Sequence, residues 1–238
     1  MPPGRALVQD CTGGGQRPAA PLQMGEPIPE AAAPRLAGVM LAGLPTALDG
    51  GAPDPAGLDL TLVVDRSGSM VEAGRIGFVK RGLTRLTEGV RPGDRVNLVV
   101  FDNEACVALE DWVAGRDDVG ILYDAIAAIT PRGSTDLGLG LHTGYRVATR
   151  VGTLEDASRH RRVVLITDAL AASGGIAAGV AAEVERAWQL YRLDLTAVSL
   201  GDASDGELLA NLAQRGGGQH TWLGARAWRS DGSLAAAP

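Results

Sequence analysis

The amino-acid sequence predicts an α/β protein built on a doubly wound, mostly parallel sheet. Between residues 58 and 223, short apolar runs alternate with segments in which apolar residues recur every three or four positions. Runs of the first kind are typical of strands buried on both faces, and the second spacing is typical of amphipathic helices. Their alternation favours parallel strands joined by helical crossovers. We therefore expect a sheet of about six strands, one of them an antiparallel edge strand, with helices on both faces.

The strands of this sheet are predicted from their apolar residues. The first expected strand begins at Leu58 and ends at Asp65, between Gly57 and Gly68. Further along, the turn-like segment 102–104 separates two apolar runs, which indicates a hairpin at one edge of the sheet. The strands expected after the first are 96–101, 105–109, 162–167, 193–200 and 220–223.

The helices are predicted from apolar residues spaced three or four apart. The first ends at the Arg-Pro-Gly-Asp segment 91–94, because Pro and Gly stop helices. Asp117 or Asp118 is expected to cap the second helix, and Ser204 with Glu207 has the form of a capping box at the last. The apolar residues of the expected helices fall within 76–90, 122–129, 137–148, 180–191 and 208–212.

Residues 1–56 differ in composition from the rest of the chain. Pro and Gly break any periodicity there, and Ala fills the gaps. This composition predicts a flexible leader that adds little to stability, followed by one folded domain at 57–224 and a tail at 225–238. The apolar island Leu36–Leu44 is expected to be a short strand laid on the sheet, and the alternative is a degraded signal segment.

Composition and charge argue against several classes of protein. The chain has 238 residues and a net charge of −6, so nucleic acid is not an expected partner. No apolar run approaches the roughly 20 residues needed to span a bilayer. No apolar run lies near Met1, so no signal peptide is predicted, and cytoplasmic and cell-surface or periplasmic locations both stay open.

The two cysteines, Cys11 and Cys106, do not predict a disulfide framework. Cys106 lies in an apolar run and is interpreted as a small buried residue. Cys11 is followed by Thr-Gly-Gly-Gly, which leaves open a lipidated cysteine with its tether. The missing apolar run upstream argues against that alternative.

Oxygen-bearing side chains follow or precede three predicted elements, and together they predict a metal site. Asp65, Ser67 and Ser69 follow the first strand. Thr135 precedes a helix, and Asp168 ends a later strand. In a doubly wound sheet these positions can meet at the edge formed by the carboxyl ends of the strands. All five are hard oxygen ligands, which suit Mg²⁺ or Mn²⁺ better than Zn²⁺, an ion that prefers His and Cys.

The two aspartates, Asp65 and Asp168, would balance the charge of a divalent ion, and three hydroxyls would complete a weakly binding shell. Without the ion, the two carboxylates would be held close together and would repel each other. The alternative is that Asp65 and the serines only cap the next helix, as Thr135 and Asp136 can cap theirs.

Several short motifs carry a resemblance to a known family. They are Asp65-x-Ser67-x-Ser69, the Gly-Ser-Thr-Asp segment 133–136, Thr167-Asp168, the segment 93–101 and the ending 208–218. Together they resemble the metal-ion-dependent adhesion site (MIDAS) and framework of a bacterial von Willebrand factor type A domain, over about residues 57–224. The resemblance implies a Rossmann-like fold.

The resemblance also implies binding without a reaction. Mg²⁺ (or Mn²⁺) would keep an open coordination position, which an Asp or Glu carboxylate of a partner protein fills, with the domain as one module of a larger assembly. Asp65 would anchor the ion, Ser67 and Ser69 would be direct ligands, Thr135 a direct or water-linked ligand, and Asp168 would act through water. Ala169 departs from the glycine usual in this family, and Ala takes a positive φ less readily than Gly. The 169–179 loop is therefore expected to follow a different path, which would change the ligand preference of the site.

A metal-dependent hydrolase or phosphoryl-transfer enzyme is the rival interpretation, because a metal beside serines could support either reaction. The sequence lacks a Gly-x-Ser-x-Gly elbow, a phosphate-binding loop and a dinucleotide fingerprint. His142, His160 and His220 lie far from the metal motif in sequence and are interpreted as surface or packing residues. A structural module whose metal site stays empty is the third possibility.

Overall fold

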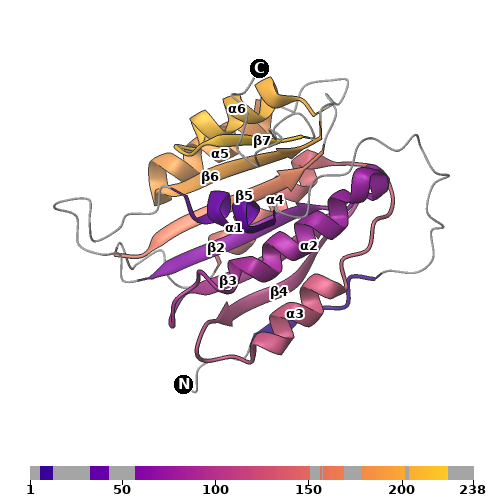
Figure 1. Ribbon diagram of the computed structural model, residues 1–238. Coiled ribbons are helices and arrows are strands. Elements are labelled where there is room, and N and C mark those ends of the chain that lie inside the picture. The colour runs from indigo at the N-terminus through magenta and orange to yellow at the C-terminus, as the bar shows by residue number, and fades with distance from the viewer. Residues whose placement is uncertain are drawn as a thin grey trace.

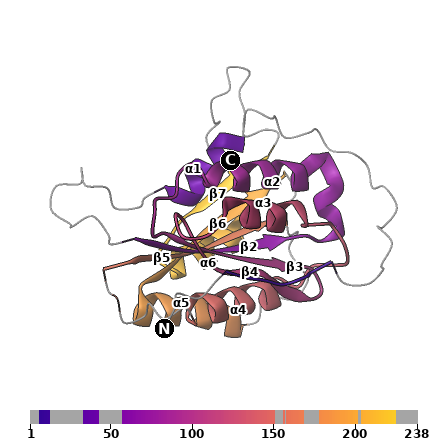
Figure 2. The same cartoon turned by 90° about the horizontal axis from the view of Figure 1, so that it is seen from below.

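The computed structural model describes residues 6–12, 33–42, 57–150, 156, 158–168, 178–201 and 204–224. Within these ranges, a seven-stranded sheet of order β1-β4-β3-β2-β5-β6-β7 lies between two layers of helices (Figures 1 and 2). The predicted fold class is confirmed. The strand beyond the expected six is β1, which comes from the predicted leader.

Five parallel strands form most of the sheet. They are β2 (Leu58–Asp65), β3 (Arg95–Phe101), β5 (His160–Thr167), β6 (Leu193–Leu200) and β7 (His220–Leu223). β2 lies at the centre and pairs in parallel with β3 and β5. All eight of its residues are buried, which explains the Leu- and Val-rich run that predicted it.

The predicted hairpin is confirmed, and β1 pairs along its outer strand, so β1 forms this edge of the sheet. β4 (Ala105–Val113) pairs antiparallel with β3 and extends four residues beyond the predicted end at Leu109. The extension is less apolar, and Asp111 within it takes a positive φ of 56°. Register shifts between Val96 and Val99 accompany the extension, and such bulges are hard to recognise from alternation alone.

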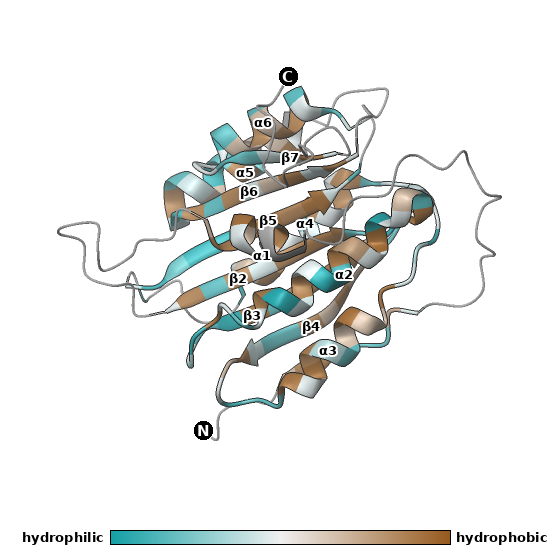
Figure 3. Ribbon diagram, viewed as in Figure 1, coloured by the Kyte–Doolittle hydropathy of each residue, from teal (hydrophilic) through white to brown (hydrophobic). Residues whose placement is uncertain are grey.

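The helices divide between the two faces of the sheet (Figure 2). They carry both hydrophobic and hydrophilic residues (Figure 3), and their buried apolar residues pack in the two cores beside the sheet. One face carries α1 (Ala33–Leu41), α2 (Arg75–Leu86) and α3 (Val119–Ala127). The opposite face carries α4 (Leu137–Ala148), α5 (Ala178–Tyr191) and α6 (Gly206–Arg215). The helices predicted from apolar spacing are therefore all present.

The caps of three helices are aspartates. Asp118 accepts a hydrogen bond from Gly120 N, as one of the two expected alternatives, and Asp136 accepts one from Leu139 N. The predicted capping box at Ser204 is wrong. The residue that caps α6 is Asp205, whose carboxylate accepts from Leu208 N, while the Ser204 hydroxyl donates to the Gly201 carbonyl.

Two glycines on α4 allow this helix to lie close to the sheet. Gly140 faces the ring of Phe101, and Gly144 faces the side chain of Val63. A Cβ at Gly140 would lie 2.5 Å from the Phe101 ring, and one at Gly144 would overlap Val63. The helix that begins beside the 131–136 loop is therefore held tightly against β2 and β3.

Part of the predicted leader is folded onto the sheet. β1 (Leu7–Val8) pairs antiparallel with β4, and α1 packs on α2. Leu36 and Met40 of α1 are fully buried. The expectation of a flexible segment is wrong for these two pieces, and residues 36–41 of the island lie in a helix where a strand was expected. The island is short and apolar on all sides, so its periodicity does not distinguish a strand from a helix.

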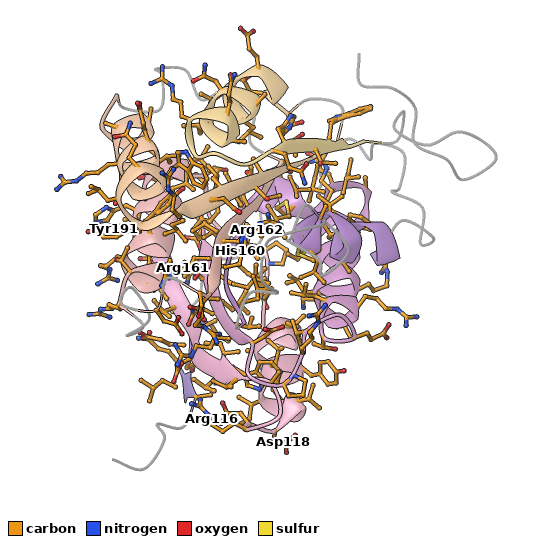
Figure 4. All side chains as sticks on the ribbon, turned by 90° about the vertical axis from the view of Figure 1, so that its left-hand side faces the viewer. Arg116, Asp118, His160, Arg161, Arg162 and Tyr191 are labelled. Carbon is orange, nitrogen blue, oxygen red and sulfur yellow. A yellow bond between two sulfur atoms is a disulfide. The ribbon has the colours of Figure 1, made fainter. Side chains whose placement is uncertain are left out.

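A buried arginine fixes the end of α1. Arg162 Nη1 donates to the carbonyl oxygens of Met40 (3.2 Å) and Ala42 (2.6 Å). Its Nε donates to Asp194 Oδ1 at 2.7 Å, and His160 Nε2 lies 2.7 Å from Asp194 Oδ2. Figure 4 shows His160 and Arg162 at the start of β5. Arg162 thus satisfies carbonyls that the helix leaves without intrahelical partners.

A disulfide joins the leader to the edge of the sheet. Cys11 and Cys106 are bonded, with their Cα atoms 5.9 Å apart. The expectation of no disulfide is wrong, and the bond leaves no thiol at Cys11 for a lipid. The bond closes a loop of 95 residues, and a cross-link over such a length typically stabilises a fold by about 2–5 kcal/mol. A single pair so far apart in the sequence has no spacing pattern that would reveal it.

The division of the chain into leader, domain and tail stays a prediction, and residues 225–238 lie outside the described ranges. Ala169 and the residues up to 177 lie outside them as well, so the expected effect of Ala169 stays a prediction. No helix in the described part of the chain is long and apolar enough to cross a membrane.

We predict that Met40→Ala lowers the free energy of unfolding by about 2–4 kcal/mol, because it removes a fully buried side chain and leaves a cavity between α1 and α2. Urea denaturation measures the loss. Leu190→Ala is the control, since Leu190 is 57% exposed and its truncation should change stability little. Equal, small effects of both variants would show that α1 is not part of the core.

Candidate metal centre

The central parallel strands have their carboxyl ends on the right in Figure 1, and four of the five predicted metal residues follow or end two of these strands. Asp65 is the last residue of β2, and Asp168 directly follows β5. Val64 is paired with Ile166 in the parallel register, so the two strands end side by side. Ser67 precedes the short 3₁₀ segment η2 (Gly68–Gly74), and Ser69 lies in it. Both aspartates are buried.

Four of the five predicted ligands form a continuous row of oxygen atoms. Ser67 is held beside the Asp65 carboxyl because its backbone N–H donates to Asp65 Oδ1 at 2.7 Å. Ser67 Oγ lies 3.1 Å from Ser69 Oγ, and Ser69 Oγ donates to Asp168 Oδ1 at 2.9 Å. The hydrogen bonds therefore gather two carboxylates and two hydroxyls at one place, although they come from segments about 100 residues apart.

Asp65 is held by both of its carboxyl oxygens. Oδ1 accepts a hydrogen bond from Ser67 N at 2.7 Å, and Oδ2 accepts one from Thr167 Oγ1 at 2.6 Å. Burial raises the pKa of the Asp65 carboxyl to about 6, the hydrogen bonds from Thr167 and Ser67 oppose the rise, and the charge of Asp168 adds to it. Desolvation is thus the main cost of the charge at Asp65.

Asp168 has a cationic partner that the sequence did not predict. Arg75, the first residue of α2, places Nη1 2.5 Å from Asp168 Oδ2. The expected repulsion between Asp65 and Asp168 is therefore present but minor, because Arg75 offsets the charge of Asp168. A basic residue at the first position of a helix opposes the helix dipole, and this anomaly is the sequence signal that could have drawn attention to Arg75.

Thr135 is exposed on the 131–136 loop, which adjoins the row of oxygens. Gly68 N donates to the Gly133 carbonyl at 3.0 Å, and Arg132 N donates to the Arg66 carbonyl at 2.7 Å. Gly133 has a φ of 65°, and a Cβ there would overlap the side chain of Asn103. The loop that carries Thr135 is thus docked on the Asp-x-Ser-x-Ser turn by backbone hydrogen bonds.

A buried charge network supports the same turn from below. Arg66 Nε donates to Asp102 Oδ2 at 2.8 Å, and Arg132 Nε donates to the same oxygen at 2.7 Å. Arg66 Nη1 also donates to the Cys11 carbonyl at 2.5 Å. The leader, the turn after β2, the β3–β4 turn and the 131–136 loop are therefore connected through Arg66 and Asp102.

The donor set fits a small hard cation. The described residues contain no group of three or more His, Cys, Asp or Glu side chains placed to hold a metal, and the candidate donors are instead two carboxylates and hydroxyls. Adjacent ligands of octahedral Mg²⁺ lie about 3 Å apart, close to the 2.9 and 3.1 Å spacings of this row. These are also hydrogen-bond distances, so hydroxyl protons hold the oxygens together when no ion is bound.

The histidines do not join this centre. His142 Nδ1 lies 3.1 Å from Glu183 Oε1 at the surface, and His160 pairs with Asp194 at the opposite ends of the strands. His220 Nε2 lies 2.9 Å from Ser199 Oγ. This serine is fully buried, and the burial of His220 lowers its pKa. The pair therefore joins β6 to β7 and does not offer an accessible nucleophile.

Comparison with known proteins agrees with the fold and the motifs. A family model described as von Willebrand factor type A domain matches residues 60–171. Residues 60–171 belong to the von Willebrand factor type A family. The YfbK protein of Escherichia coli (strain K12), itself uncharacterized, is 29% identical over 110 residues, which are 46% of this chain and 18% of YfbK.

Solved structures share the fold of this type A domain. A von Willebrand factor type A protein from Catenulispora acidiphila aligns with a TM-score of 0.60 and 16% identity, over 70% of this chain and 38% of that one. Proximal thread matrix protein 1 from the mussel byssus, solved with zinc in its MIDAS motif, aligns with a TM-score of 0.52 and 18% identity, over 71% and 42% of the two chains.

We predict that Asp65→Asn stabilises the metal-free type A domain at neutral pH. The raised pKa means that the charged carboxylate costs stability in the folded protein. This cost is absent below about pH 3.8, grows up to about pH 6 and is complete above it. The gain is therefore about 3 kcal/mol near pH 8 and nearly zero near pH 4.

Urea denaturation in EDTA at the two pH values measures this effect. Asp124→Asn is the control, because Asp124 lies exposed on α3 and its neutralisation should change stability little at either pH. An Asp65→Asn variant that is less stable than the parent at about pH 8 would contradict the account of a costly buried charge.

Proposed function

We propose that this type A domain is a metal-dependent protein-interaction module, whose divalent cation binds a carboxylate of a partner protein. The observation that carries the proposal is the row of oxygens from Asp65 through Ser67 and Ser69 to Asp168. The row is assembled by hydrogen bonds from the Ser67 backbone and between the side chains, at the carboxyl edge of the sheet. This is the edge at which open α/β sheets bind ligands. The match to YfbK covers only 18% of that protein. The function of the whole protein is therefore proposed here and is not taken from its relative.

The proposed roles follow from charge and hydrogen bonding. Asp65 supplies the buried negative charge that anchors the ion. Ser67 and Ser69 are the direct neutral ligands, and Asp168, already paired with Arg75, acts through water. Thr135, exposed on the docked loop, is the ligand that responds to loop position. Neutral hydroxyls leave much of the positive charge of the ion in place, and that charge attracts a partner's carboxylate.

Mg²⁺ or Mn²⁺ is the proposed ion, on the chemistry of the oxygen donors. The mussel protein of the same fold was solved with zinc in its MIDAS motif. Zinc therefore has to be included in any test of ion preference for this chain, and we expect it to gain little over Mg²⁺ because the row offers neither His nor Cys.

We also propose that the protein works outside the cytoplasm, in an oxidising compartment. The Cys11–Cys106 disulfide supports it, because such bonds persist in oxidising compartments and are rare in the cytosol. An enzymatic function has less support from the site. The one histidine–serine pair described above is buried. In the metal row, the Ser67 hydroxyl pairs with the Ser69 hydroxyl, and Ser69 donates to Asp168. The described histidines pair with other residues.

Calorimetric titration with Mg²⁺ tests the proposed site directly. We predict one Mg²⁺ per chain for the parent, loss of binding in Asp65→Asn, and about 10- to 100-fold weaker binding in Ser69→Ala. Ser158→Ala is the control, since Ser158 is exposed and bonds only locally to Asp156. Parallel titrations with Mn²⁺ and Zn²⁺ rank the ions. Unchanged Mg²⁺ binding in Asp65→Asn would show that the ion is held elsewhere.

Partner binding has its own test, with the immobilised full chain and a lysate in Mg²⁺ or in EDTA. We predict a protein that is retained in Mg²⁺, released by EDTA and lost with Thr135→Ala. Thr130→Ala is the matched control, because Thr130 is also exposed and donates only to the nearby Ala128 carbonyl. Capture that survives EDTA or is equal in the two threonine variants would contradict a metal-mediated contact.

A further inference from the structure

Arg75 brings a buried positive charge to the candidate metal centre. Its Nη1 lies 2.5 Å from Asp168 Oδ2 and 3.3 Å from the Ser69 carbonyl oxygen. The residue is only 9% exposed, and the side chain of Asp168 only 1%. This ion pair therefore lies directly beside the row of oxygens and is largely shielded from water.

The surroundings of Arg75 are shaped to hold its guanidinium group. Gly201, at the end of β6, has a φ of 79°, and a Cβ there would lie 2.7 Å from Arg75 Nη2. The guanidinium group thus lies between the 3₁₀ segment η2, the residue after β5 and the residue after β6. Within the described ranges, its Nε has no hydrogen-bond partner. A buried cation with an unused donor is costly, which points to a role beyond holding the fold together.

We propose that Arg75 is a positioning residue that sets the charge of the metal centre by holding and neutralising Asp168. This inference rests on the proposed metal-binding function. With Arg75 in place, the two buried carboxylates and the guanidinium group carry one net negative charge. A divalent cation then leaves an excess of positive charge, which is available to a partner's carboxylate.

Without Arg75, the two carboxylates would cancel the charge of the ion completely. The ion would bind more tightly, and less of its charge would remain for a partner. Glu72 also lies near Arg75, with Oε2 3.5 Å from Nη1. Its side chain is 24% exposed, so water screens its charge more than that of Asp168.

Mg²⁺ titration of charge variants tests this role. Arg75→Gln is expected to bind Mg²⁺ about tenfold more tightly than the parent, because one positive charge near the ion is removed. Arg75→Lys should stay close to the parent, since it keeps the charge. Arg81→Gln is the control for net charge, as Arg81 lies exposed on the same helix.

Arg75→Gln could be less stable than the parent without metal, so the melting temperatures of both proteins are also measured with and without Mg²⁺. The proposal predicts that Mg²⁺ raises the melting temperature of Arg75→Gln by more than it raises that of the parent. A purely structural role predicts the same loss with and without Mg²⁺, and that result would overturn the proposal. Equal or weaker Mg²⁺ binding by Arg75→Gln, with normal binding by the parent, would overturn it as well. A parent that binds no Mg²⁺ would instead overturn the proposed function and this inference together.

Discussion

The parallel pairing of β2 with β5 is the constraint on which the candidate site depends. It ends two buried strands side by side and thereby brings Asp65 and Asp168 together. Two carboxylates removed from water repel each other and are costly to charge. Each of the two is stabilised by different partners. Asp65 receives hydrogen bonds from Ser67 and Thr167, whereas Asp168 receives Ser69 and the guanidinium group of Arg75.

The leader and the site are connected through Arg66. This residue occupies the first of the two variable positions of the Asp-x-Ser-x-Ser turn, and its side chain is almost completely buried. It holds Asp102 on one side and the carbonyl of the disulfide-bonded Cys11 on the other. The disulfide therefore fixes a backbone group that completes the charge network under the turn, in addition to closing a long loop.

The fold could be predicted from the sequence because local pattern and burial agree there. β2 is rich in Leu and Val because both its faces are covered, and the helices show the expected spacing. The row from Asp65 to Asp168 could be anticipated because strand ends share one edge of the sheet. α1, the disulfide and Arg75 could not. Each depends on contacts between segments distant in sequence, such as Arg162 with the end of α1, and such contacts leave no local pattern.

Anomalous diffraction from crystals grown with Mn²⁺ tests the central claim most directly, because it locates the ion among the candidate ligands. The account predicts a single anomalous peak bound by the hydroxyls of Ser67 and Ser69 beside Asp65, with Asp168 still paired with Arg75. A peak at another position, or a peak bound directly by Asp168 with Arg75 displaced, would contradict it.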